Sequence, residues 1–94
     1  SFEIDTGFLD EDEVEIEIPN GYIVDAKPSD IVITDKFGVY KMELKSIADN
    51  KLLYKRSYLL NKGSYAKEEY ENFRSFSEQV SRADNAKIIF KRNL

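Results

Sequence analysis

Apolar and polar residues alternate along much of the chain. Between residues 13 and 18, valine and isoleucine alternate with glutamate, a period of two that is typical of a strand with one buried and one solvated face. Similar stretches follow as far as residue 61, and in the last of them both alternate sets contain leucine, which indicates a central strand. The sequence predicts strands over 13–18, 22–27, 30–34, 39–47 and 51–61.

Turn residues separate these strands. Asn20 and Gly21 are the residue pair that a type I′ turn prefers, so we expect 13–18 and 22–27 to form a hairpin. Pro28 ends the second of these strands because it has no N–H group to donate. Consecutive strands are expected to be antiparallel neighbours. Residues 1–12 are expected to form a loop or an edge strand.

The apolar period changes after residue 64. The next apolar residues are three, three, four and three positions apart, which places them on one stripe of an amphipathic helix. They are Tyr70, Phe73, Phe76, Val80 and Ala83. The spacing predicts a helix over about 66–83, and the apolar run that follows predicts a final strand over 86–91.

These elements predict a single domain over residues 1–94, of the α+β class and mainly β. We expect antiparallel sheets in a sandwich-like arrangement, with the one C-terminal helix closing one side or end. A single sheet backed by the helix is the alternative, because the apolar stripe of the helix must cover something apolar.

The composition excludes most catalytic designs. The chain has 94 residues with no cysteine and no histidine, so it contains no thiolate nucleophile, disulfide or imidazole base. We expect no enzyme activity, no catalytic residue, no metal site and no cofactor. No apolar run is long enough to enter a membrane, so no membrane insertion is expected. The start at Ser1 without methionine suggests a piece of a longer protein.

Charge is divided unevenly along the chain. Residues 1–35 hold eleven acids and one base, a net charge of −10, whereas residues 36–94 hold thirteen bases and seven acids, a net charge of +6. We expect acidic and basic strands to lie side by side and neutralise each other. A basic face for an acidic partner is the alternative. Nucleic acid is not an expected partner, because the whole domain is acidic.

Two groups of side chains are candidates for binding. The acidic run Asp10-Glu11-Asp12-Glu13 offers calcium-type oxygen ligands but lacks the spacing of an EF-hand loop, so we expect a solvated acidic loop. Tyr54 and Tyr58 flank Arg56 on one strand face and could bind a glycan or a protein. Packing is the simpler role for these tyrosines, because aromatic rings suit half-buried sheet surfaces.

Four segments resemble a known family, the DUF3858-like domains found at the C-terminus of bacterial transglutaminase-like proteins, common in Bacteroidetes. The segments are Ile18-Pro19-Asn20-Gly21-Tyr22 with Ala26-Lys27-Pro28, Gly38-Val39-Tyr40, 68–76 and 83–91. The resemblance implies a non-catalytic, β-rich accessory domain of a periplasmic or cell-envelope protein. It also implies a partner, a neighbouring transglutaminase-like domain in the same polypeptide, which this domain packs against or positions.

Overall fold

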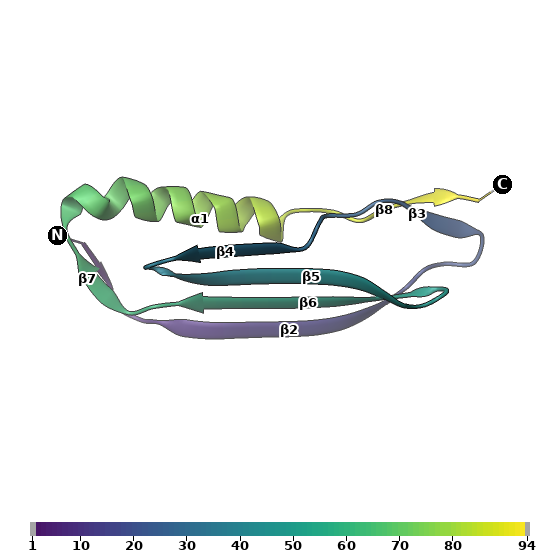
Figure 1. Ribbon diagram of the computed structural model, residues 1–94, viewed down its shortest axis with the longest axis horizontal. Helices are drawn as coiled ribbons and strands as arrows, with labels where there is room; N and C mark the ends of the chain where they lie inside the picture. The colour runs from purple at the N-terminus through teal and green to yellow at the C-terminus, as the bar shows by residue number, and fades with distance from the viewer. Residues whose placement is uncertain (1, 94) are drawn as a thin grey trace.

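A four-stranded antiparallel sheet forms the centre of the molecule. The computed structural model describes residues 2–93, and the molecule is elongated, with extents of 57 × 20 × 15 Å. The strand order is β2-β6-β5-β4, and every neighbouring pair is antiparallel (Figure 1). The strands are β2 (Phe8–Glu17), β4 (Ile31–Asp35), β5 (Gly38–Ala48) and β6 (Lys51–Leu60).

The remaining elements lie around this sheet. A 3-10 turn, η1 (Lys67–Glu69), leads into the helix α1 (Tyr70–Asp84), which runs alongside β4 (Figure 1). Two further sheets have two strands each and lie at opposite ends of the molecule. One pairs β1 (Phe2–Ile4) with β7 (Gly63–Tyr65), and the other pairs β3 (Tyr22–Ala26) with β8 (Ile89–Arg92). No helix within residues 2–93 is long and apolar enough to cross a membrane.

The predicted fold class is confirmed. The chain is mainly β with antiparallel sheets, and it has one C-terminal helix followed by a final strand. The helix covers one face of the four-stranded sheet, and its apolar stripe supplies the buried side chains of Phe76 and Val80. Its start differs from the expected residue 66 because a 3-10 turn precedes the α-helix.

The predicted hairpin between 13–18 and 22–27 is wrong. Strand β2 pairs with β6, and β3 pairs with β8. Gly21 has a φ of +82° but Asn20 does not have a positive φ, and the N–H of Tyr22 donates to the carbonyl of Pro19 at 3.1 Å. This combination fits a type II turn, which splays its flanking strands instead of pairing them.

Of the two alternatives for residues 1–12, the edge strand is the one that forms, because Phe2–Ile4 is β1 and the edge strand β2 begins at Phe8. The expected acidic loop at Asp10–Glu13 is wrong. Ten consecutive residues of β2 pair with β6 without a bulge, from Phe8 opposite Leu60 to Glu17 opposite Lys51. The acidic run is therefore part of a strand. Its polar composition concealed this, since the pairing depends on a partner strand more than thirty residues away in the sequence.

The core lies between the helix and the sheet. Tyr40, Met42 and Leu44 point from alternate positions of β5 toward the helix, and all three are buried. Phe37 in the β4–β5 turn is completely buried, with ring centroids 4.8 Å from Tyr65 and 5.2 Å from Phe73. These contacts join the turn, the short β1–β7 sheet and the start of the helix into one cluster.

Replacing Phe76 by alanine should lower the free energy of unfolding by about 3–5 kcal/mol, because it removes a fully packed ring and leaves a cavity. Tyr70→Ala is the matched control on the same helix, since Tyr70 is 51% exposed. Urea denaturation of both variants measures the difference. Equal losses would mean that the helix does not pack on the sheet through Phe76.

Candidate functional site

The three predicted binding residues lie on the face of β6 that the helix covers. Tyr54 and Tyr58 are half-buried and pack against the core. The ring of Tyr58 contacts those of Tyr40 and Phe76, with centroids 5.8 and 6.3 Å apart. The two tyrosines and Arg56 therefore lie together, as alternate residues of one strand must, but their side chains are engaged in packing.

Arg56 is the centre of a charged cluster, which we call the Arg56 cluster: Arg56, Asp84, Asp10, Asp12 and Tyr40. Its guanidinium donates from Nε and Nη2 to the two carboxylate oxygens of Asp84, at 2.6 and 2.9 Å. Nη1 donates to Asp10 at 3.1 Å and to Asp12 at 3.2 Å. The guanidinium also lies 5.7 Å from the centre of the Tyr40 ring. The bidentate bond to Asp84 is the strongest form of this contact.

The position of Asp84 explains why it needs this partner. It is the last residue of α1, where the negative end of the helix dipole disfavours a carboxylate. Arg56 offsets that repulsion, and the hydroxyl of Tyr40 donates a further hydrogen bond to Asp84 at 2.6 Å. The hydrogen bonds from Arg56 lower the pKa of Asp84 below its ordinary value, although partial burial acts in the opposite direction.

The same contacts affect the two partners of Asp84. Burial, together with the hydrogen bond to Asp84, raises the pKa of Tyr40 far above the physiological range, so its hydroxyl remains a donor. The hydrogen bond to Asp84 raises the pKa of Arg56, which stays protonated. The side chain of Arg56 is only 14% exposed. Because most of its N–H groups are already bonded, the geometry gives Arg56 a structural role.

The acidic run is divided by the alternation of β2. Asp10 and Asp12 face Arg56, whereas Glu11 and Glu13 lie on the opposite face of the sheet. No group of three or more potential ligands within residues 2–93 has the arrangement of a metal site. The acidic run therefore contributes side chains to both faces of the sheet, and this division was not predicted.

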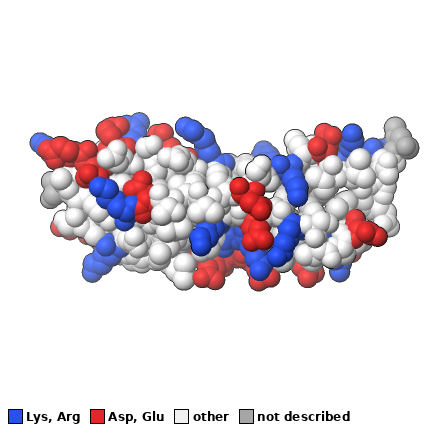
Figure 2. Space-filling view, in the orientation of Figure 1, with Lys and Arg blue, Asp and Glu red and all other residues white. Residues whose placement is uncertain are grey.

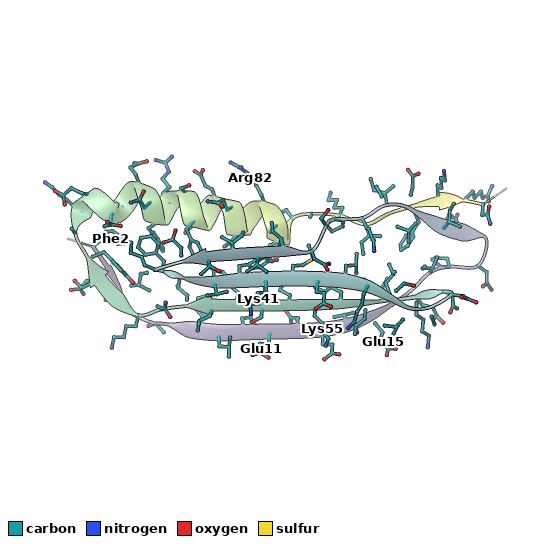
Figure 3. All side chains as sticks on the ribbon, in the orientation of Figure 1. Phe2, Glu11, Glu15, Lys41, Lys55 and Arg82 are labelled. Carbon is teal, nitrogen blue, oxygen red and sulfur yellow. The ribbon has the colours of Figure 1, made fainter. Side chains whose placement is uncertain are left out.

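The face of the four-stranded sheet turned away from the helix, which we call the open face, is not covered by any element within residues 2–93. Strand β2 contributes glutamates to it, and β5 and β6 contribute lysines, four of which Figure 3 labels as Glu11, Glu15, Lys41 and Lys55. A depression of about 620 Å³ is lined by Glu11, Lys41 and Lys55 among others. Acidic and basic side chains are intermixed on the side of the molecule that Figure 2 shows.

Apolar side chains interrupt this charged face at one end. Leu9, Leu59 and Val39 are directly opposite one another on β2, β6 and β5, and we call them the apolar row. Val32 on β4 lies beside the row and is 65% exposed, while Leu9 is 60% exposed. An apolar surface on an otherwise charged sheet is characteristic of a contact site. The leucines on both faces of β6 fit its inner position in the sheet, but the described residues supply no layer over Leu53 and Leu59.

The Arg56 cluster predicts a pH-dependent effect of Asp84→Asn. The free energy of unfolding of the variant should be about 1.5–3 kcal/mol lower at pH 7, because the substitution breaks charge-assisted hydrogen bonds. The lowered pKa means that the carboxylate stabilises the fold fully above its ordinary pKa of 3.8 and stops doing so as pH falls through the lower folded value. The difference between the variant and the unmodified chain should therefore shrink below about pH 4.

Denaturant unfolding at a series of pH values measures this difference. Glu78→Gln is the control on the same helix, because its exposed pair with Arg74, at 3.6 Å, should contribute less than about 1 kcal/mol. If Asp84→Asn lowers the free energy of unfolding by the same amount at pH 7 and in the acid range, the predicted role of the Asp84 carboxylate charge is contradicted.

Comparison with known proteins gives one result. Residues 1–90 match a family model described as a domain of unknown function with solved-structure structure, DUF3858. No curated protein and no solved structure gives a significant match. Because the match covers nearly the whole chain, the protein belongs to the DUF3858 family, as the four sequence segments predicted.

Proposed function

We propose that this protein is a non-catalytic accessory domain that packs against, or positions, a neighbouring transglutaminase-like domain of the same polypeptide. The observation that carries the proposal is the open face with its apolar row. A sheet face that bears exposed leucine and valine becomes more stable when another surface covers it, at roughly 25 cal/mol per Å² of apolar area buried.

The location of the row supports a partner within the same chain. The row is at the end of the sheet where β2 begins and β6 ends, and Phe2, the first described residue, lies at that same end (Figure 3). A domain joined upstream would therefore be held close to the row, and a short connection raises the effective concentration of one surface for the other.

The chemistry of the chain supports a non-catalytic role. The sequence has neither the cysteine nor the histidine that a transglutaminase-like reaction uses. The charged side chains around the apolar row suit the polar rim of an interface. The proposal includes a periplasmic or cell-envelope location and an origin in Bacteroidetes, both of which rest on the resemblance of the four segments alone.

The alternative proposal is a glycan- or protein-binding module whose binding surface is the aromatic face with Tyr54, Arg56 and Tyr58. The side chains there are occupied by packing and by the Arg56 cluster, which favours the docking proposal over this one. Ligand binding at that face would require Arg56 to exchange its carboxylate partners for the ligand.

The docking proposal predicts the effect of charging the apolar row. In a polypeptide that contains the upstream core, Leu9→Glu combined with Val32→Glu should lower the melting temperature of the core as much as deleting residues 1–94. Calorimetry of the full polypeptide measures both effects. Because the two side chains are exposed, the double variant of the isolated chain should still fold. Its free energy of unfolding should fall by less than about 1 kcal/mol.

The matched control is Ile89→Glu, since Ile89 is 52% exposed but lies in the β3–β8 sheet at the other end of the molecule. This variant should leave the core unchanged. The proposal fails if deleting the domain alters neither the stability nor the activity of the core, or if Ile89→Glu has the same effect as the double variant.

A further inference from the structure

Strand β2 has one unpaired edge along its whole length. It is the outermost strand of the four-stranded sheet, and its ten residues pair with β6 on one side only. Within residues 2–93, no backbone hydrogen bond outside that pairing reaches β2. In Figure 1 nothing lies beyond it at the lower edge of the sheet. Every second residue of β2 therefore presents a free N–H and C=O group to solvent.

The other edge of the sheet is different. Strand β4 has only five residues, and the helix runs alongside it. The edge of β2 is twice as long and is regular, since its pairing with β6 contains no bulge. Short strands, bulges, covering elements and charged side chains are the usual means of blocking an edge, and of these β2 has only charge.

Charge distinguishes β2 further. Four glutamates lie on its open-face side, about 7 Å apart along the strand. They are Glu11, Glu13, Glu15 and Glu17. In the described part of the chain none of them is within 4 Å of a basic group, although Asp10 and Asp12 on the other side contact Arg56. On β6, Lys55 is directly opposite Glu13 and Lys51 is directly opposite Glu17, whereas Glu11 and Glu15 have no base directly opposite. The domain therefore offsets only part of the negative charge of this edge.

This charge makes the edge selective. Two copies that paired through β2 would bring their acidic rows together, and like charges in adjacent strands are destabilising. A strand with lysine or arginine at alternate positions would instead place a cation beside each glutamate. On its other side that strand would meet apolar residues of β2, among them Val14, which is 49% exposed, and Ile16.

We propose that the free edge of β2 is a strand-addition site for an extended segment of a partner protein that has lysine or arginine at every second position. Backbone hydrogen bonds along the edge supply the affinity, and the glutamate row selects the charge pattern. The glutamate row of β2 begins next to Leu9 of the apolar row, but strand addition uses the backbone groups of the edge, so it does not depend on the docking of an upstream domain.

The experiment uses the ¹⁵N-labelled chain and a capped peptide of sequence Lys-Thr-Lys-Val-Lys-Thr-Lys. Titration followed by NMR should shift the amide signals of β2 and slow the hydrogen exchange of its outward-facing amides. Raising the salt from about 0.1 M to about 1 M shortens the screening length from about 10 Å to about 3 Å, so the affinity should fall about tenfold or more.

Control peptides separate strand addition from simple charge attraction. A peptide of the same composition with contiguous lysines should bind at least about tenfold more weakly. Two further peptides carry N-methyl groups, one at the odd residues and one at the even residues. Because alternate N–H groups of a strand point to opposite edges, each of these peptides has one edge that cannot donate hydrogen bonds. One of the two should lose binding, because N-methylation removes the hydrogen bonds that strand addition requires.

Paired variants test the glutamate row. Glu13→Lys with Glu15→Lys should abolish binding, and Glu13→Gln with Glu15→Gln should weaken it. Glu71→Lys with Glu78→Lys changes the net charge equally on the exposed side of α1 and should have no effect. The proposal is overturned if the shifts centre on β5, if both N-methylated peptides bind as well as the parent peptide, or if the helix variants weaken binding equally.

Discussion

The contact between Arg56 and Asp84 fixes the position of the helix on the sheet. Arg56 is on β6, an inner strand of the sheet, and Asp84 ends the helix, so the bidentate pair fastens the helix to the centre of the sheet. The same guanidinium reaches the carboxylates of Asp10 and Asp12 on β2. Without this cation, three carboxylates would repel one another at the junction of three elements.

The helix is fastened at its other end as well. Lys36 in the β4–β5 turn contacts Glu69, with 2.6 Å between the ammonium and the carboxylate, at the start of the helical segment. That contact is exposed, and it lowers the pKa of Glu69 through a hydrogen bond to its carboxylate. Between the two ends, the helix places Phe76 and Val80 on the sheet. Charged contacts therefore define where the helix lies, and apolar burial supplies most of the stability.

One helix covers only one face of the sheet, and this has consequences for function. The open face keeps an exposed apolar row among charged residues, and β2 keeps a free edge. Both surfaces are suited to contacts with other protein segments, and they differ in chemistry, since the row offers apolar area and the edge offers backbone hydrogen bonds with negative charge. A small domain can thus present two surfaces of different chemistry.

Much of the fold could be predicted from local patterns. The period of two identified β5 and β6, and the helical spacing of Phe73, Phe76 and Val80 identified the helix, because burial on one face imposes that spacing on the sequence. The sequence left residues 1–12 undecided between a loop and an edge strand, since Asp10 to Glu13 contain no apolar residue to mark a buried face. The period of two correctly placed Tyr54, Arg56 and Tyr58 on one strand face. It did not predict the carboxylates that Arg56 contacts.

The sequence by itself determined the mainly β character, the single C-terminal helix, the absence of histidine and cysteine, and the family. Each of these depends on residue types and their local spacing. Only the tertiary structure decided that β2 pairs with β6, that Asp84 meets Arg56, and that residues 2–93 leave one sheet face and the edge of β2 free. The paired residues in these features are 28 to 52 positions apart, and the spacing of neighbouring residues carries no record of which distant groups will meet.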